Sequence, residues 1–185
     1  MKQLQNLKTL KAQKGVTLIE LMVYMVIAAL VLASVVGIIT LVRGDNKIDT
    51  EGKRLQFGME KVMNFLATSP DTSAVDNALA IRIGAIPPDA IQGTNVITTK
   101  FGGNATYAAA SLNNPNDAVA VTNDRLDEKT CLNFTKAQGS SFQRVSVNGT
   151  VVKAPTDTTV QEGALVGACN NNAAGNTIIF ERQKA

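Results

Sequence analysis

A single carboxylate, Glu20, lies inside an apolar stretch near the N-terminus. Val16, Leu18 and Ile19 precede it, and Leu21 follows it. A charged group at the centre of a helix in lipid costs about 2.5–3.5 kcal/mol and less near the interface, so such a residue normally has a function or a partner. The alternative is a side chain that reaches the membrane edge and keeps its charge in water. Glu20 is therefore either an edge residue or one half of a functional charge pair.

Cys131 and Cys169 are the two cysteines of the chain. An even pair in an oxidising compartment is typical of a disulfide, whereas two metal-binding thiolates would need further soft ligands. The chain has no histidine, which is also the commonest general base. The sequence contains no phosphate-binding glycine loop. These residues favour a disulfide, and we expect no catalytic residues, no metal site and no cofactor.

The segment that holds Glu20 is long enough to cross a membrane. Residues 21–42 carry no charge. At about 1.5 Å per residue they span roughly 33 Å as a helix, which is enough for a bilayer. A secretory signal would have a shorter apolar core of about 7–15 residues and a small-residue cleavage site. We therefore expect residues 16–42 to form a transmembrane helix that the mature protein retains.

The positive charge of the chain is concentrated before this helix. Lys2, Lys8, Lys11 and Lys14 precede residue 15 without an acidic neighbour, and the rest of the chain is close to neutral. The positive-inside rule predicts that residues 1–15 are cytoplasmic and that the C-terminal part lies outside. The near-neutral remainder lacks the basic face that a phosphate backbone requires, so we expect no nucleic-acid partner.

The stretch Lys14-Gly15-Val16-Thr17-Leu18-Ile19-Glu20-Leu21 resembles the processing site of type IV prepilins. In that family a membrane-embedded aspartyl prepilin peptidase cuts after the glycine and N-methylates the new first residue. The resemblance covers the basic leader and the whole apolar helix. It implies that residues 1–15 are removed and that Val16 becomes the methylated N-terminus. Val16 stands where many members have Phe or Met.

The implied cleavage suggests a role for Glu20. A new cationic amine at Val16 would lie one helical turn from the carboxylate, which could neutralise it within a subunit or between neighbours. An unpaired charge buried in an apolar filament core costs several kcal/mol. Our hypothesis is that Glu20 selects the register of assembly by meeting the N-terminal amine of a neighbouring subunit.

A helical pattern continues beyond the apolar segment. Apolar residues recur at spacings of three, four and seven, and charged residues mark the other faces. The apolar set is Ile48, Leu55, Met59, Val62, Met63 and Leu66, and the charged set is Asp49, Glu51, Lys53, Arg54, Glu60 and Lys61. Residues 43–69 are therefore predicted to be an amphipathic continuation that ends at Ser69-Pro70-Asp71. Gly44, Gly52 and Gly58 could permit a bend or local melting.

Residues 70–185 are predicted to form a globular head. A helix is expected near residues 74–83, and turns are expected at Ile86-Pro87-Pro88-Asp89 and Phe101-Gly102-Gly103. Strands are predicted at 118–122, 142–147, 150–153 and 176–181, with Asn148-Gly149 as a hairpin turn. The predicted fold class is α+β. A long N-terminal α-helix, half transmembrane and half amphipathic, packs on an antiparallel β-sheet head.

The head also carries the cysteine pair. A disulfide between Cys131 and Cys169 would close a loop of about 38 residues and stabilise the head by roughly 3–4 kcal/mol. The resemblance to pilins points the same way, because pilins have a C-terminal disulfide-bounded region exposed on the filament. The segment 126–149 resembles the C-terminal region of type IVb pilins.

The resemblance implies a structural protein, a type IVb-like major pilin of a filament used for adhesion, aggregation or conjugative cell contact. Its expected partners are other copies of itself in a helical homopolymer, the prepilin peptidase, the inner-membrane assembly machinery and the membrane before assembly. The precursor would lie in the bacterial inner membrane with a periplasmic head, and the assembled pilus would be extracellular.

Two alternatives stay open at this point. A type II secretion pseudopilin shares the leader and the helix, although major pseudopilins usually lack a disulfide loop. The other alternative is a single-pass membrane-anchored binding protein or enzyme that carries Glu20 by chance.

Overall fold

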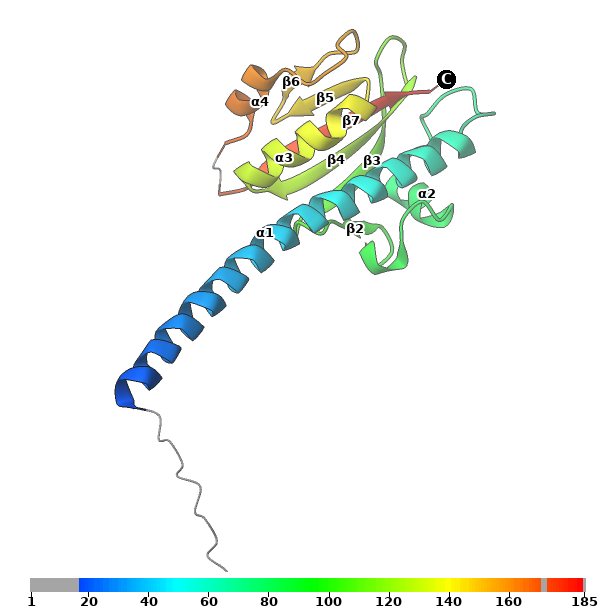
Figure 1. Ribbon diagram of the computed structural model, residues 1–185. Coiled ribbons are helices and arrows are strands. Elements are labelled where there is room, and N and C mark those ends of the chain that lie inside the picture. Colours follow the sequence, from blue (N-terminus) through cyan, green and yellow to red (C-terminus); the bar gives the residue numbers. More distant parts are fainter. Residues whose placement is uncertain (1–16, 171–172, 185) are drawn as a thin grey trace, which may run out of the picture. The chain divides into compact units, whose positions relative to one another are not determined.

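The computed structural model describes residues 17–170 and 173–184, and for residues 35–45 it describes the backbone. The chain divides into two compact units, Met1–Arg43 and Gly44–Ala185. One helix, α1 (Leu18–Phe65), contributes residues to both units (Figure 1). The two units differ in secondary structure. Among the described residues, the helical residues 18–43 are the only secondary structure of the first unit, and the second unit contains the sheet.

Helix α1 is continuous over 48 residues. Thr17 begins it, since its hydroxyl accepts a hydrogen bond from Glu20 N (3.4 Å) and its carbonyl accepts one from Leu21 N (3.1 Å). The helix ends shortly before Pro70, where Ser69 N donates to Leu66 O in a final turn. Gly44, Gly52 and Gly58 lie within the helix and do not interrupt it.

The head contains an antiparallel sheet that has seven strands in the described residues, in the order β1-β2-β3-β4-β7-β5-β6 (Figure 1). The strands are β1 (Ile91–Gln92), β2 (Val96–Thr98), β3 (Asn104–Ala110), β4 (Ala118–Leu126), β5 (Arg144–Val147), β6 (Thr150–Lys153) and β7 (Asn176–Gln183). The two long strands β4 and β7 pair at its centre. Since β7 is the last strand in the chain, the C-terminal segment joins the two halves of the sheet.

Short helices lie between α1 and β1 and between later strands. They are α2 (Asn77–Arg82), the 3₁₀ turn η1 (Pro88–Ala90), α3 (Glu128–Gln138), the 3₁₀ turn η2 (Gly139–Ser141) and α4 (Glu162–Ala168). Asp76 caps α2 by accepting from Leu79 N at 2.7 Å, and Asp127 caps α3 by accepting from Thr130 N at 2.9 Å. The structure places α2 within the helix predicted near residues 74–83, and η1 overlaps the predicted break at residues 86–89.

The four predicted strands are present as β4, β5, β6 and β7. The predicted hairpin is also present, because Val147 pairs with Thr150 across Asn148 (φ 49°) and Gly149 (φ 83°). Positive φ at both central residues is the geometry that Asn-Gly favours. Strands β1, β2 and β3 were not predicted, and β3 in particular is rich in alanine, which has little intrinsic preference for strands.

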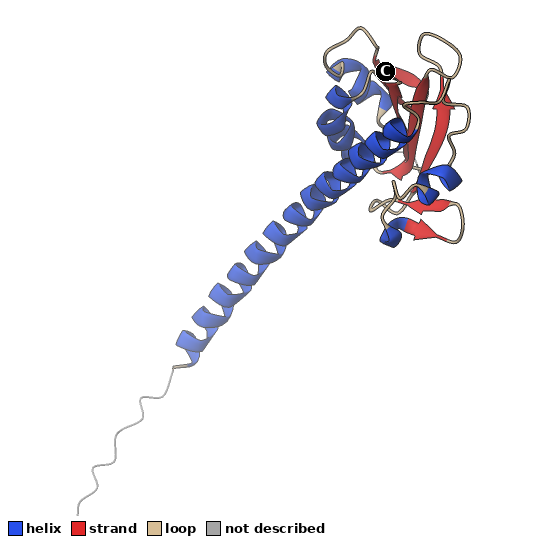
Figure 2. Ribbon diagram, turned by 90° about the vertical axis from the view of Figure 1, so that its right-hand side faces the viewer, coloured by secondary structure: helices blue, strands red, loops and turns tan. Residues whose placement is uncertain are grey.

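The core lies between the sheet and the helices that cover one of its faces, α3 and the C-terminal part of α1 (Figure 2). Leu55, Met59 and Val62 of α1 are buried there, and so is Leu66, which directly follows the helix, as their predicted spacing requires. Aromatic rings fill the space beside α3, with the Phe134 and Phe180 ring centroids 5.5 Å apart. This packing confirms the α+β fold with a helix on an antiparallel sheet.

Two glycines of α1 allow close approach to the rest of the head. A Cβ at Gly58 would lie 3.2 Å from Tyr107 Cζ and 3.3 Å from Ala85 O. A Cβ at Gly52 would lie 2.6 Å from Cδ of Gln138. In this structure both glycines therefore serve helix packing and not the bend or local melting that their low helix propensity suggested.

Candidate functional site

The first unit presents an exposed apolar helix surface. In the segment 18–34 every large apolar side chain is exposed, with exposed fractions from 51% for Ile27 to 74% for Leu18. Contiguous apolar surface of this kind marks a site of contact with protein or lipid, because exposing it to water is unfavourable. The segment is thus a candidate interaction site by its surface alone.

Within the part of the chain that the structure describes, no helix combines the length and the apolar character needed to cross a membrane. The predicted span 16–42 includes Val16, which lies outside the described residues, and residues 35–42, whose side chains are not described. The predicted cleavage site between Gly15 and Val16 also lies outside the described residues. The membrane span and the cleavage site therefore stay predictions.

Glu20 lies in the first turn of α1, and its side chain is exposed. Thr17 Oγ1 donates to Glu20 Oε2 at 3.5 Å, a long hydrogen bond between neighbours in sequence. A carboxylate at this end of a helix interacts favourably with the helix dipole. Because the side chain is exposed and weakly held, the carboxylate is accessible to a cation from another molecule.

The two cysteines form a disulfide, as predicted. Cys131 lies in α3 and Cys169 directly follows α4, with their Cα atoms 5.9 Å apart. Both are buried, so the bond is part of the head's core. It links α3 to the C-terminal end of α4 through two cysteines that are 38 residues apart in sequence.

An asparagine cluster, Asn148 and Asn176, lies beside the disulfide. Asn148 Nδ2 donates to Ala168 O (2.9 Å) and to Asn176 Oδ1 (2.8 Å). Asn176 Nδ2 donates to Leu126 O (3.0 Å) and to Asn170 O (2.9 Å). The cluster fixes the chain on both sides of Cys169. Sequence reasoning found the Asn-Gly turn but missed this second use of Asn148.

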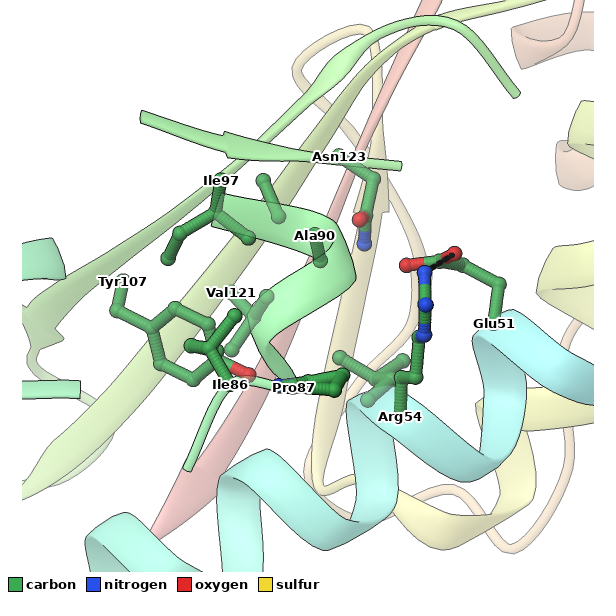
Figure 3. A pocket seen from close by; sticks show the side chains of 11 residues that line it. Glu51, Arg54, Ile86, Pro87, Ala90, Ile97, Tyr107, Val121 and Asn123 are labelled. Carbon is green, nitrogen blue, oxygen red and sulfur yellow. Dashed lines mark ion pairs between the residues drawn. The ribbon is translucent and has the colours of Figure 1, made fainter. Parts of the chain in front are cut away.

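The head also contains a small pocket between α1, β3, β4 and the segment 86–97 (Figure 3). It offers about 20 Å³ to the centre of a water molecule. Most of its lining is apolar and includes Tyr107. The charged or amide side chains that line it are Glu51, Arg54 and Asn123. We refer to it below as the α1 pocket.

Glu51 corrects one sequence prediction. The sequence pattern predicts that it lies on a face of the amphipathic helix other than the apolar one, but it is buried with the apolar residues and only 6% exposed. Its Oε2 accepts a hydrogen bond from Lys100 N at 2.9 Å and lies 3.5 Å from the Arg54 guanidinium. Burial raises the pKa of Glu51, and these two contacts oppose the rise. The physical reason for its burial is that the neighbouring loop and Arg54 replace water around the carboxylate.

Arg54 extends the polar contacts of the α1 pocket toward the surface. Its guanidinium also pairs with Asp89 of η1, which accepts a second hydrogen bond from Lys100 Nζ at 3.0 Å. The hydrogen bond from Lys100 is the main reason that the pKa of Asp89 lies below its usual range. These contacts connect α1 to the segments on both sides of β1 and β2.

Comparison with known proteins gives two family matches. The family described as PilS N terminal matches residues 46–183. The chain belongs to the PilS N-terminal family. A second family, described as the prokaryotic N-terminal methylation motif, matches residues 10–36. That range includes the predicted cleavage site and Glu20.

Solved structures give the fold of this PilS-family chain. The type IVb pilin from Salmonella typhi is 18% identical, with a TM-score of 0.55 over 74% of this chain and 99% of that one. TcpA, a type IV pilin from the Vibrio cholerae El Tor biotype, is 14% identical, with a TM-score of 0.57 over 75% of this chain and 99% of that one. No curated protein matches the chain. The predicted type IV pilin fold is confirmed, since both solved structures are pilins and share the fold of this chain.

The predicted site residues of the PilS-family chain fall in different units. Glu20 belongs to the first unit, and the Cys131–Cys169 disulfide belongs to the second. Among the described residues, no group of three or more acidic, cysteine or histidine side chains could hold a metal ion. The α1 pocket was not predicted. One signal could have revealed it, since Glu51 lies four residues before Leu55 and eight before Met59, on the same buried stripe.

Proposed function

We propose that this PilS-family pilin is the major structural subunit of a type IV pilus, processed after Gly15 and polymerised through residues 16–42. The observation that supports this most directly is the methylation motif at residues 10–36, which coincides with an exposed apolar helix. The head adds a pilin fold with a C-terminal disulfide. The filament would serve adhesion, aggregation or conjugative contact between cells.

Burial of the exposed apolar helix favours both insertion of the precursor into the membrane and assembly of the subunit into the filament. Burial of one large apolar side chain is worth about 1.5–3 kcal/mol. Side chains such as Leu18, Leu30 and Leu32 are exposed in the isolated chain. In the precursor they would be covered by the inner membrane, and in the filament they would be covered by the helices of neighbouring copies. The subunit therefore leaves the membrane only when other subunits replace the lipid.

Glu20 would control which arrangement of subunits is accepted. After cleavage, the amine of Val16 is a cation at the start of the apolar helix, and the exposed carboxylate of Glu20 is a partner for it. In an apolar filament core an unpaired charge costs several kcal/mol. A subunit would thus be added in the register that joins its amine to the Glu20 of a neighbour.

The subunit would meet several partners in different compartments. A prepilin peptidase would cut the leader and methylate Val16, and an inner-membrane assembly machinery would add the subunit to the filament. The leader, residues 1–15, would be cytoplasmic and the head periplasmic before assembly. The filament itself would be extracellular, where an oxidising environment suits the Cys131–Cys169 disulfide.

The mass of the native N-terminus tests the proposal. The mature protein, purified from its own cells, is expected to begin with N-methylated Val16. A Gly15→Leu variant should keep its leader, whereas Gly37→Ala, a glycine substitution away from the junction, should be processed normally. An uncleaved wild-type chain, or a cut at another position, would refute the pilin function. Electron microscopy of surface filaments then separates a pilus from a periplasmic pseudopilus.

A further inference from the structure

The α1 pocket contains a buried hydrogen-bond donor without a partner. Asn123 of β4 is 2% exposed, and its Nδ2 has no hydrogen-bond partner among the described residues. Figure 3 shows its side-chain amide directed into the pocket, with Glu51 and Arg54 on the α1 side. Native proteins rarely leave such a group unpaired, because a buried donor loses its hydration without compensation. The donor therefore points to something that binds in the pocket.

The size of the pocket limits what can bind. A buried water requires about 10–15 Å³ of space for its centre and two to four polar partners. The α1 pocket has about 20 Å³ of such space. Its apolar walls, among them Ile97, Tyr107 and Val121, are themselves buried in the core and leave no room for a larger group.

The charged groups around the pocket limit which kinds of molecule can bind there. A cation could not accept the hydrogen bond of Asn123 and would also meet the Arg54 guanidinium. An anion would meet the Glu51 carboxylate. An apolar molecule would leave the Asn123 donor unpaired. What remains is a small neutral molecule that both accepts and donates hydrogen bonds.

We infer that the α1 pocket binds one water molecule, which accepts a hydrogen bond from Asn123 Nδ2 and donates one to the Glu51 carboxylate. This water connects the central strand β4 to α1. Through Glu51 it extends to Lys100 N, and through Arg54 to Asp89. It hydrates a carboxylate that the fold has otherwise removed from solvent.

The α1 pocket lies in the interior of the head, so the water in it does not depend on filament assembly. The charged and titratable groups that face Glu51 are Arg54 on its own helix, Lys100 before β3, and Tyr107 of β3. Burial, followed by the charge of Glu51, raises the pKa of Tyr107. Tyr107 thus stays neutral, so Glu51 is the group near the pocket whose titration reports on the water.

The chain offers a matched control for a test. Thr135 Oγ1 of α3 is also buried without a hydrogen-bond partner among the described residues, but Thr135 is not among the residues that line the α1 pocket. Asn123→Leu and Thr135→Val each remove an unpaired polar group with little change in size. Removal of a group that has no partner at all is neutral or stabilising. Removal of a group that holds a water should be destabilising.

The experiment compares both variants with the wild type as full-length chains in detergent micelles. Asn123→Leu should lower the folding equilibrium constant about tenfold at neutral pH, whereas Thr135→Val should not lower it. Carbon-detected NMR of the Glu51 carboxyl should show a higher titration midpoint in Asn123→Leu, because the ionised form has lost its water. A structure that resolves ordered solvent should show one water in contact with both groups.

Three results would overturn the inference. One is an Asn123→Leu variant that is as stable as the wild type, like Thr135→Val. Another is an unchanged Glu51 titration in that variant. The third is a solvent-resolving structure with a metal ion, an anion or no bound molecule in the pocket.

Discussion

Two carboxylates of α1, Glu20 and Glu51, have opposite surroundings although they belong to one helix. Glu20 is exposed, and the hydrogen bond that its carboxylate accepts from Thr17 is long, at 3.5 Å. Glu51 is buried and is held by Lys100 N and Arg54. A weakly held carboxylate is available to another molecule, whereas a fully held one serves its own fold. These surroundings fit the assembly role that we propose for Glu20 and a structural role for Glu51 within the head.

Glu20→Gln should reduce filament yield by more than about tenfold, because even 1.4 kcal/mol changes an equilibrium tenfold and the loss of a partner for a buried amine costs more. The yield of sheared surface filaments, measured by immunoblot and electron microscopy, checks this. Asp49→Asn, which changes an exposed carboxylate in the same helix, is the control and should assemble normally. A normal filament yield from Glu20→Gln would contradict the proposed pairing.

Asp117 is expected to make the stability of the head depend on pH. Its carboxylate accepts hydrogen bonds from Leu112 N (2.7 Å), Asn113 N (2.9 Å) and Asn114 N (2.8 Å). The hydrogen bond from Leu112 N is the largest reason that the pKa of Asp117 lies below its usual 3.8. Since the folded state favours the ionised form, Asp117 stabilises the head above pH 3.8, and this contribution is lost as the pH falls through the lowered pKa.

Asp117→Asn should therefore melt at a lower temperature than the wild type at neutral pH. The difference should shrink as the pH falls below 3.8 and through the lowered pKa, where the wild-type carboxyl becomes protonated as well. Thermal unfolding followed by circular dichroism at several pH values measures both. A difference that stays constant with pH would mean that the substitution acts through shape and not through charge.

At the scale of elements, glycines decide how closely α1 packs. Gly58 allows the ring of Tyr107 and Ala85 O to approach the helix, while Gly163 of α4 has nothing within 4 Å of where its Cβ would lie. Both lie in helices, so their intrinsic costs are comparable, about 1 kcal/mol relative to alanine. The two glycines differ in their surroundings, because another part of the head packs against Gly58 and no part that the structure describes packs against Gly163.

Gly58→Ala should lower the free energy of unfolding by about 1–3 kcal/mol, since Tyr107 is buried and cannot move away freely. Gly163→Ala, the same chemical change in open space, should raise it by up to about 1 kcal/mol. Urea unfolding of both variants tests the pair. Equal effects of the two substitutions would show that helix propensity and not packing controls Gly58.

At the scale of the whole molecule, the head depends on contacts between distant parts of the chain. The disulfide joins residues 38 positions apart, and the last strand, β7, pairs with both β4 and β5. Such contacts gain stability only after a long loop has been closed. The disulfide reduces that cost by restricting the unfolded chain.

Replacement of both Cys131 and Cys169 by alanine should lower the free energy of unfolding of the head by roughly 3–4 kcal/mol. Urea unfolding under oxidising and reducing conditions measures this. Reductant should destabilise the wild type by a similar amount and leave the double-alanine variant unaffected. If reductant left the wild-type midpoint unchanged, the disulfide would not be a main source of stability.

The local and periodic features of this protein could be predicted from its sequence alone. The apolar stripe of Leu55, Met59, Val62 and Leu66 predicts a buried helix face, because helical periodicity is local. Asn148-Gly149 predicts a hairpin because few residues tolerate its dihedral angles. The stretch around Gly15 and Glu20 points to pilin processing, and the methylation-motif match includes it.

Only the tertiary structure decided what depends on partners far apart in the chain. Alanine-rich β3 is a strand because β4 pairs with it along its length, which outweighs its weak propensity. Glu51 is buried because Lys100 and Arg54 replace its hydration, and Gly58 is required because Tyr107 occupies the adjacent space. Propensity and periodicity act over a few residues, whereas burial and pairing are set by neighbours that only the folded chain brings together.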